Sequence, residues 1–130
     1  MKKLIHNYSP LLSIIWALTI FCLCATPGKY IPSVNWLELL SFDKLVHATM
    51  FYILCTLLFI TKIKYQQTQQ WLVIYFIICV LYGGLLEVMQ ATYFSNRSGD
   101  WLDFIANSFG CLIALATFNK LNKLFETIRV

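Results

Sequence analysis

Nine polar residues recur at short, regular spacings within a chain that is otherwise strongly apolar. They are Asp43, Lys44, His47, Glu87, Gln90, Arg97, Asp100, Asp103 and Asn107. Within three segments the polar residues are three or four apart, so they share one face of a helix in each segment. Carboxylates, an imidazole, amides and two cations brought together could bind a polar head group, transfer protons or hold a divalent metal.

The composition places these residues in a membrane. The chain has 130 residues, of which 59% are hydrophobic and 12% charged, and its mean hydropathy is +0.69. These values lie far outside the range of soluble domains and predict one integral membrane domain over residues 1–130. The net charge of +4 comes from basic residues near helix ends, which argues against nucleic acid as a partner.

Four segments are long and apolar enough to cross about 30 Å of hydrocarbon, which takes roughly 20 helical residues. They run over about 9–26, 43–61, 70–92 and 100–118. The predicted fold class is therefore an all-α, four-helix transmembrane bundle. Ala106, Gly110 and Ala114 recur every four residues and predict close helix approach, as do Gly83 and Gly84. The short connection predicts that the third and fourth spans are antiparallel neighbours.

Lysine and arginine are distributed unevenly between the two sides of the predicted bundle. With the N-terminus in the cytoplasm, seven of them fall inside and three outside. This bias predicts that both termini are cytoplasmic. The apolar segment after Lys2 and Lys3 is expected to be a retained first span, because no convincing signal-peptide cleavage site follows it; a cleaved signal peptide is the alternative. In the first outer loop, Asn35 and Glu38 form a capping pair, which predicts a short helix along the outer interface; an irregular loop is the alternative.

The polar residues of three spans are expected at one depth under the outer surface. His47 and Asn107 lie roughly 6 to 10 Å in from their helix starts at 1.5 Å per residue, and Glu87 is comparably deep. An ionised side chain near the centre of an isolated span costs about 2.5–3.5 kcal/mol, and less near an interface. A shared, wet, outward-facing pocket would let these groups satisfy one another.

Simpler interpretations exist for several of these residues. Asp43 and Asp100 could be helix N-caps, since Asp accepts a hydrogen bond from a free backbone N–H. His47 could be an ordinary packed histidine, and Lys44 could extend to the interface. Arg97 could neutralise an acid or bind a carboxylate or phosphate. The five cysteines all fall in apolar runs without C-x-x-C spacing and are interpreted as small packing residues.

The order and spacing of the polar residues resemble a known family. The series is Asp43-Lys44-x-x-His47, then Gly84-x-x-Glu87-x-x-Gln90, then Arg97-x-x-Asp100-x-x-Asp103-x-x-x-Asn107-x-x-Gly110. It is similar to that of the VanZ-like family of small bacterial membrane proteins. The resemblance implies a four-span protein of the bacterial cytoplasmic membrane. The founding member of the family is linked to low-level resistance to the glycopeptide teicoplanin.

Two hypotheses for function follow. In the first, the outer pocket binds a lipid-linked cell-envelope precursor, another membrane lipid or a lipoglycopeptide, with Lys44 and Arg97 facing an anionic group. Trp36, Trp101 and Tyr93 are expected to cover the acyl or ring portion. In the second, the site is a hydrolase or transferase for a lipid head group, in which His47, Glu87 and Asp103 are candidate ligands of a divalent metal. No complete catalytic motif is present, so no cofactor is assigned. A proton-coupled transporter is disfavoured because the inner halves of the spans lack a polar path.

Overall fold

The chain folds as four long helices. The computed structural model describes residues 1–26, 36–94 and 99–126, and for residues 36–41 and 126 it describes the backbone alone. The helices are α1 (Lys2–Ala25), α2 (Trp36–Lys64), α3 (Gln70–Thr92) and α4 (Trp101–Glu126), with no strand among the described residues. All four contain a stretch long and apolar enough to cross a membrane. The predicted all-helical fold with four candidate spans is confirmed.

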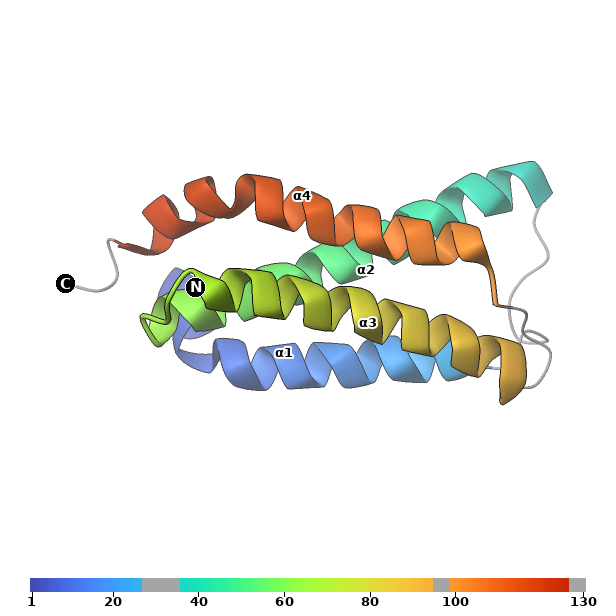
Figure 1. The fold of residues 1–130 in the computed structure, drawn as a ribbon, viewed down its shortest axis with the longest axis horizontal. Helices are drawn as coiled ribbons and strands as arrows, with labels where there is room; N and C mark the ends of the chain where they lie inside the picture. The colour runs from blue at the N-terminus through green and yellow to red at the C-terminus, as the bar shows by residue number, and fades with distance from the viewer. Residues whose placement is uncertain (27–35, 95–98, 127–130) are drawn as a thin grey trace.

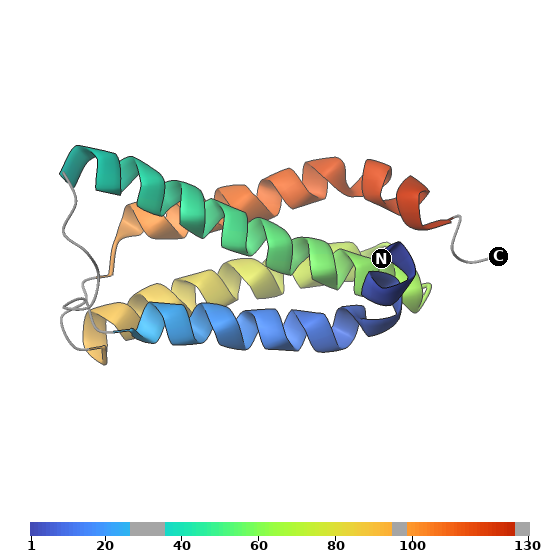
Figure 2. The ribbon, with the colours of Figure 1, turned by 180° about the vertical axis from the view of Figure 1, so that it is seen from behind.

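The helices lie alongside one another as an elongated bundle (Figures 1 and 2). The start of α1 and the end of α4 lie at one end of the bundle. The end of α3 and the starts of α2 and α4 lie at the other end, which is called the polar end below. α2 and α4 share the most extensive interface, and α3 also packs along α4, as predicted for neighbouring spans. Which end faces the cytoplasm remains a prediction from the charge bias.

α1 begins at Lys2, earlier than predicted, and contains Pro10. A proline has no N–H, so the carbonyl four residues before it loses its helical partner. The Ser9 hydroxyl donates to that carbonyl, on His6, at 3.2 Å. Because this bond replaces the missing one, the helix continues on both sides of the proline.

α2 is one continuous helix from Trp36. The separate interfacial helix expected in the first outer loop is not present as such, because its residues form the first turns of α2. No proline or glycine interrupts the sequence between Trp36 and Lys64, so nothing breaks the helix. Among the residues whose side chains are described, Phe42–Lys64 is long and apolar enough to cross a membrane. α4 likewise extends beyond the predicted end, since Phe118 and Phe125 are both buried against the bundle.

Close contact between α2 and α4 depends on Gly110. A Cβ added there would lie 2.0 Å from the Ala48 carbonyl oxygen, far inside van der Waals contact. Ala106 and Ala114, one turn on either side, are buried. The small-residue stripe predicted on α4 therefore faces α2 and brings their side chains within hydrogen-bond reach at the polar end.

α1 is attached to the rest of the bundle through backbone carbonyls. The donors and acceptors are Trp16 Nε1 to Met50 at 3.0 Å, Tyr82 to Ala17 at 2.7 Å, and Gln90 Nε2 to Cys24 at 3.3 Å. Buried polar side chains need such partners in a membrane, where no water replaces them. Gln90, predicted as a site residue, is thus occupied in attaching α1 to α3.

Candidate functional site

A lysine surrounded by carboxylates lies at the polar end. The Lys44 Nζ of α2 donates to Asp100 Oδ2 at 2.7 Å and to Asp103 Oδ1, and it lies 4.0 Å from Asp43 Oδ2. Asp103 is buried, whereas Asp43 and Asp100 are partly exposed. Three of the predicted site residues therefore surround one ammonium group, and the expectation that Lys44 merely reaches the interface is incomplete.

Asp100 has a second role as the N-cap of α4. Its Oδ1 accepts the Leu102 N–H at 2.9 Å, as a capping carboxylate does. The hydrogen bond from Lys44, and next that from the Leu102 N–H, hold the pKa of Asp100 below its ordinary value. The cap predicted at Asp100 is confirmed. The cap predicted at Asp43 is wrong, because α2 starts at Trp36 and Asp43 lies within it.

His47 is a buried link between α2 and α4. Its Nδ1 lies 3.1 Å from Asn107 Oδ1, and both side chains are buried. In the neutral ring one nitrogen donates and the other accepts, so the direction of this contact depends on the His47 tautomer. Nε2 faces two carboxylates, at 3.8 Å from both Asp43 Oδ1 and Asp103 Oδ2.

Asp43, His47 and Asp103 form a set that could hold a metal ion. One ligand atom from each lies within 4.8 Å of the others. An imidazole with two carboxylates suits Zn²⁺ or a similar divalent ion. The sequence predicted Glu87 as the third ligand with His47 and Asp103. In the structure the third member of the set is Asp43, and Glu87 does not belong to it. Lys44 contacts the same Asp103 and competes with any metal for its charge.

Glu87 lies on the α3 side of the polar end, in contact with the start of α4. Its Oε2 accepts the Asp100 N–H at 3.1 Å, while its Oε1 has no hydrogen-bond partner among the described residues. The side chain is 9% exposed. The close approach requires Gly99, where a Cβ would lie 2.6 Å from the Glu87 carbonyl oxygen. A buried carboxylate oxygen without a partner is costly, which makes this atom the natural point for a ligand donor.

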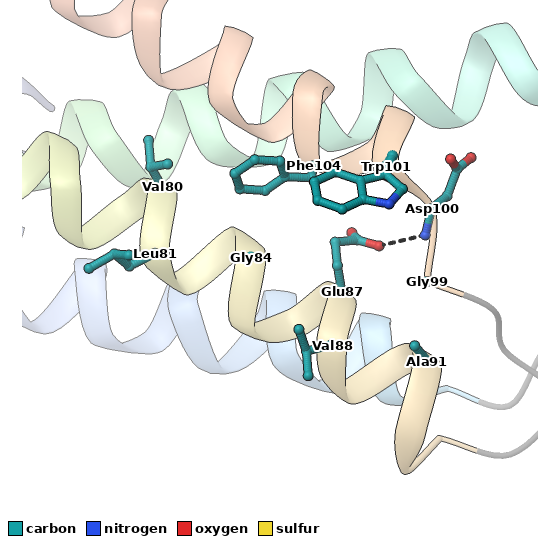
Figure 3. A pocket seen from close by; sticks show the side chains of 10 residues that line it. All are labelled: Val80, Leu81, Gly84, Glu87, Val88, Ala91, Gly99, Asp100, Trp101 and Phe104. Carbon is teal, nitrogen blue, oxygen red and sulfur yellow. Dashed lines mark hydrogen bonds between the residues drawn. The ribbon is translucent and has the colours of Figure 1, made fainter.

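A groove between α3 and α4 includes this carboxylate in its lining (Figure 3). Its volume is about 560 Å³. The lining residues are Val80, Leu81, Gly84, Glu87, Val88, Ala91, Gly99, Asp100, Trp101 and Phe104. All but Glu87 and Asp100 are apolar or glycine. Leu81, Val88 and Trp101 are more than half exposed, so the groove opens on the outer surface of the bundle.

Acids dominate the described part of the polar end. It contains four carboxylates and one cation, Lys44. The carboxylates are those of Asp43, Glu87, Asp100 and Asp103. Arg97, the other predicted cation, lies outside the described residues.

Of the aromatic residues expected to cover a ligand, Trp101 lines the groove. Tyr93 is highly exposed and is not one of the groove-lining residues. The side chain of Trp36 is outside the described residues. One of these three aromatic residues therefore lines the candidate ligand groove.

Sequence reasoning missed two features. The first is the groove, whose apolar walls could not be distinguished from other lipid-facing residues. The second is that Cys55, Cys79 and Cys111 converge on one point, although they were interpreted as separate packing residues. The cysteines lie eight residues from the polar residues of the same helices, a regularity that was visible in the sequence.

Four apolar helices, with polar residues from three of them gathered at one end of the bundle, define a multi-pass membrane protein. The chain belongs to the VanZ/LLP1 family, whose model matches residues 5–123. The match includes the first span, for which the sequence motifs alone offered no support. No curated protein matches the chain, and no solved structure does.

Proposed function

We propose that this protein binds a membrane lipid or lipid-linked cell-envelope precursor, with the lipid chain in the α3–α4 groove and the head group at the polar end. The observation that carries the proposal is that an apolar groove open to the side of the bundle is lined by Glu87, whose Oε1 is buried without a partner among the described residues. A long apolar tail and a polar head fit that combination.

The groove suits entry from the bilayer. Its exposed walls, including Leu81, Val88 and Trp101, belong to helices that lie against lipid in a membrane. Its volume is within the range of roughly 300–1,000 Å³ that is usual for small-molecule sites. Trp101 at the start of α4 is placed where indole rings favour the interface between head groups and acyl chains.

The charge of the polar end selects the head group. Carboxylates accept hydrogen bonds, and the described ammonium is already paired with Asp100 and Asp103. A bare phosphate is repelled by this layer. A head group rich in hydroxyl or amino donors, as in a lipid-linked sugar, can donate to Glu87.

The test compares lipid binding by two variants of α3. Val80→Trp fills the groove, whereas Ile77→Trp places the same ring on an exposed position of α3 outside the groove lining. Purified protein is incubated with a polyprenyl-linked amino sugar and bound lipid is counted by native mass spectrometry. Val80→Trp should lose binding, and Ile77→Trp should retain it. Equal binding by both variants would refute the proposal.

A role in low-level teicoplanin resistance belongs to the same proposal. A lipoglycopeptide carries an acyl chain and a hydroxyl-rich head, the chemistry that the groove and Glu87 would accept. The charge bias of the loops supports a polar end on the outer face of the bacterial cytoplasmic membrane, where such a drug acts. Expression should raise the inhibitory concentration of teicoplanin, and Glu87→Gln at equal membrane level should abolish the increase. An unchanged increase would remove Glu87 from this role.

A second candidate function is a hydrolase or transferase for a lipid head group. The Asp43, His47 and Asp103 set favours it, because a divalent ion held there would lie beside the polar end of the groove. His47 Nε2 could otherwise accept a proton. Turnover of polyprenyl diphosphate by purified protein, lost on chelation and restored by Zn²⁺ or Mn²⁺, would support this candidate. Absence of both turnover and bound metal would exclude it.

A further inference from the structure

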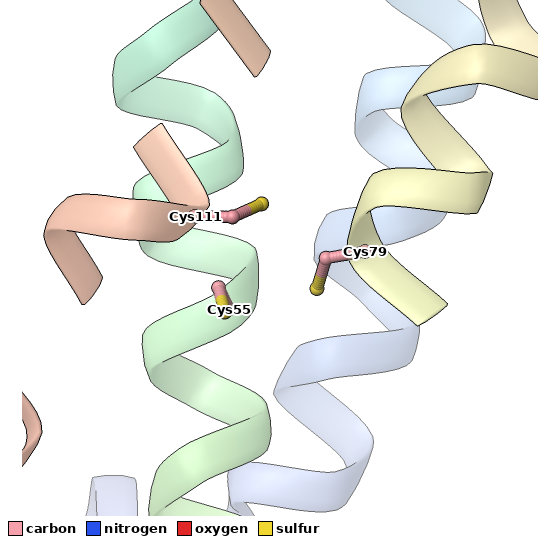
Figure 4. A group of neighbouring side chains, drawn as sticks. All are labelled: Cys55, Cys79 and Cys111. Carbon is pink, nitrogen blue, oxygen red and sulfur yellow. The ribbon is translucent and has the colours of Figure 1, made fainter. Parts of the chain in front are cut away.

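Three cysteines from three helices meet in the centre of the bundle. Cys55 of α2, Cys79 of α3 and Cys111 of α4 are 0% exposed, and their sulfur atoms lie within 4.8 Å of one another. Figure 4 shows the side chains extending from their separate helices into the space between them. All three are free thiols.

The thiols lie about two turns deeper than the polar residues, on the buried side of each helix. Cys55 follows His47 by eight residues, Cys111 follows Asp103 by eight, and Cys79 precedes Glu87 by eight. Eight residues are a little over two turns, or about 12 Å along a helix. The face that carries one polar residue of each helix at the end of the bundle thus carries a cysteine two turns deeper. The interior faces of the three helices therefore meet at two levels, once at the polar residues and once at the cysteines.

A single packed layer separates the two levels. Phe51, Gly83 and Asn107 lie midway on the same faces, four residues from each level. A Cβ on Gly83 would lie 3.2 Å from the Phe51 ring and 3.3 Å from the Asn107 Cβ, so the three residues fill the layer. Asn107 joins this layer to His47 above it. The thiols are therefore screened from water but near the polar end.

Three sulfur ligands in this arrangement suit a soft metal ion. A trigonal metal with bonds of about 2.3 Å needs sulfurs about 4 Å apart. The observed limit of 4.8 Å requires a contraction of less than 1 Å, which small rotations of the side chains supply. Thiolates select Cu(I) and similar soft ions over hard ones.

The bundle core offers the metal three ligands. Phe59, Leu86 and Ala114 belong to the same buried hydrophobic cluster as the three cysteines. No fourth Cys, His, Asp or Glu among the described residues joins the three sulfurs. Cysteine binds a metal as the thiolate, so each sulfur that binds releases its S–H proton. Structural Zn²⁺ sites take four ligands, whereas a set of three soft sulfurs favours Cu(I).

We propose that Cys55, Cys79 and Cys111 form a binding site for a soft monovalent metal ion of the Cu(I) class. This site is separate from the lipid groove and from the Asp43, His47 and Asp103 set. Ag(I), which has the same charge and softness without redox chemistry, is the appropriate second probe.

The test uses the full-length protein in detergent without oxygen. The parent is Cys22→Ser/Cys24→Ser, which retains only the three central thiols. It is titrated with Cu(I) held by a competing chelator, and bound metal is measured by elemental mass spectrometry. The parent should bind one ion, and Cys55→Ser, Cys79→Ser or Cys111→Ser should each weaken binding at least about tenfold. No binding by the parent, or tighter binding of Zn²⁺ than of Cu(I), would overturn the proposal.

A second measurement does not depend on whether the variants fold. X-ray absorption by the Cu(I)-loaded parent reports the number and type of ligand atoms directly. Three sulfur neighbours at about 2.3 Å are expected. Two sulfurs, or nitrogen and oxygen neighbours, would place the ion elsewhere in the protein and contradict the proposal.

Discussion

Replacement of Lys44 by methionine tests the charge balance of the polar end. Methionine keeps the length of the apolar stem and removes the ammonium that pairs with Asp100 and Asp103. The described carboxylates at this end would then face no described cation. The protein should become less stable, because acids held together without a counter-charge repel one another and lose hydrogen bonds.

The size of the effect follows from the exposure of the partners. Removing one member of a buried ion pair costs about 3–5 kcal/mol, whereas an exposed pair contributes about 0–1 kcal/mol. The Asp103 side chain is 10% exposed and that of Asp100 is 36% exposed. The buried partner dominates, so Lys44→Met should lower the free energy of unfolding by about 3 kcal/mol.

The assay is reversible unfolding in mixed detergent micelles, with a double-mutant cycle. Asp103→Asn removes the buried acid, so the double variant should recover part of the loss, with a coupling energy of about 1–3 kcal/mol. Lys64→Met at the opposite end is the matched control, since Lys64 donates to the exposed Asn7 carbonyl. The reasoning is refuted if Lys44→Met costs no more than Lys64→Met, or if the two changes at the polar end are simply additive.

Three further predictions concern packing, pH and topology. Gly110→Ala should cost at least about 3 kcal/mol in the same unfolding assay, because its Cβ meets the Ala48 backbone, whereas Gly84→Ala meets a ring that can move and should cost less; similar costs would contradict the packing. The lowered pKa of Asp100 implies that its ion pair stabilises the fold above the ordinary Asp pKa and is lost as pH falls below about 4, so Asp100→Asn should flatten the acid limb of the stability curve measured by circular dichroism; an unchanged limb would count against it. A thiol at the exposed position 93, in a background without the native thiols, should react with an impermeant reagent added outside intact cells; protection there with reaction from the cytoplasm would reverse the predicted topology.

Hydropathy and helical spacing predicted the helices and which polar residues share a face. These features depend on local sequence, and the cost of isolated charges in a membrane explains why His47, Glu87 and Asp103 come to one end of the bundle. The start predicted for α2, at residue 43, was wrong. A helix continues through polar residues until a breaker or a cap stops it, and neither is present between Trp36 and Asp43.

The groove and the metal candidates depend on how far apart the helices pack, which spacing alone does not determine. Gly99 brings the start of α4 against Glu87, so this acid is held by the α4 backbone rather than joining His47. An apolar binding groove in a membrane protein is also hard to predict from sequence, because a groove wall and a lipid-facing surface have the same composition. The convergence of the cysteines could have been predicted, since Cys55 and Cys111 continue the four-residue spacing of the polar residues on α2 and α4.

The position of a bound lipid chain tests most directly whether the α3–α4 groove binds lipid. A polyprenyl-linked amino sugar with a photoreactive group in its chain would be crosslinked to the protein in nanodiscs, and the modified residues mapped by mass spectrometry. Crosslinks to groove residues such as Val80 and Phe104 are expected. Equal labelling of Ile14 and Leu18 on the exposed surface of α1 would mean that the lipid merely surrounds the bundle, and would contradict the account.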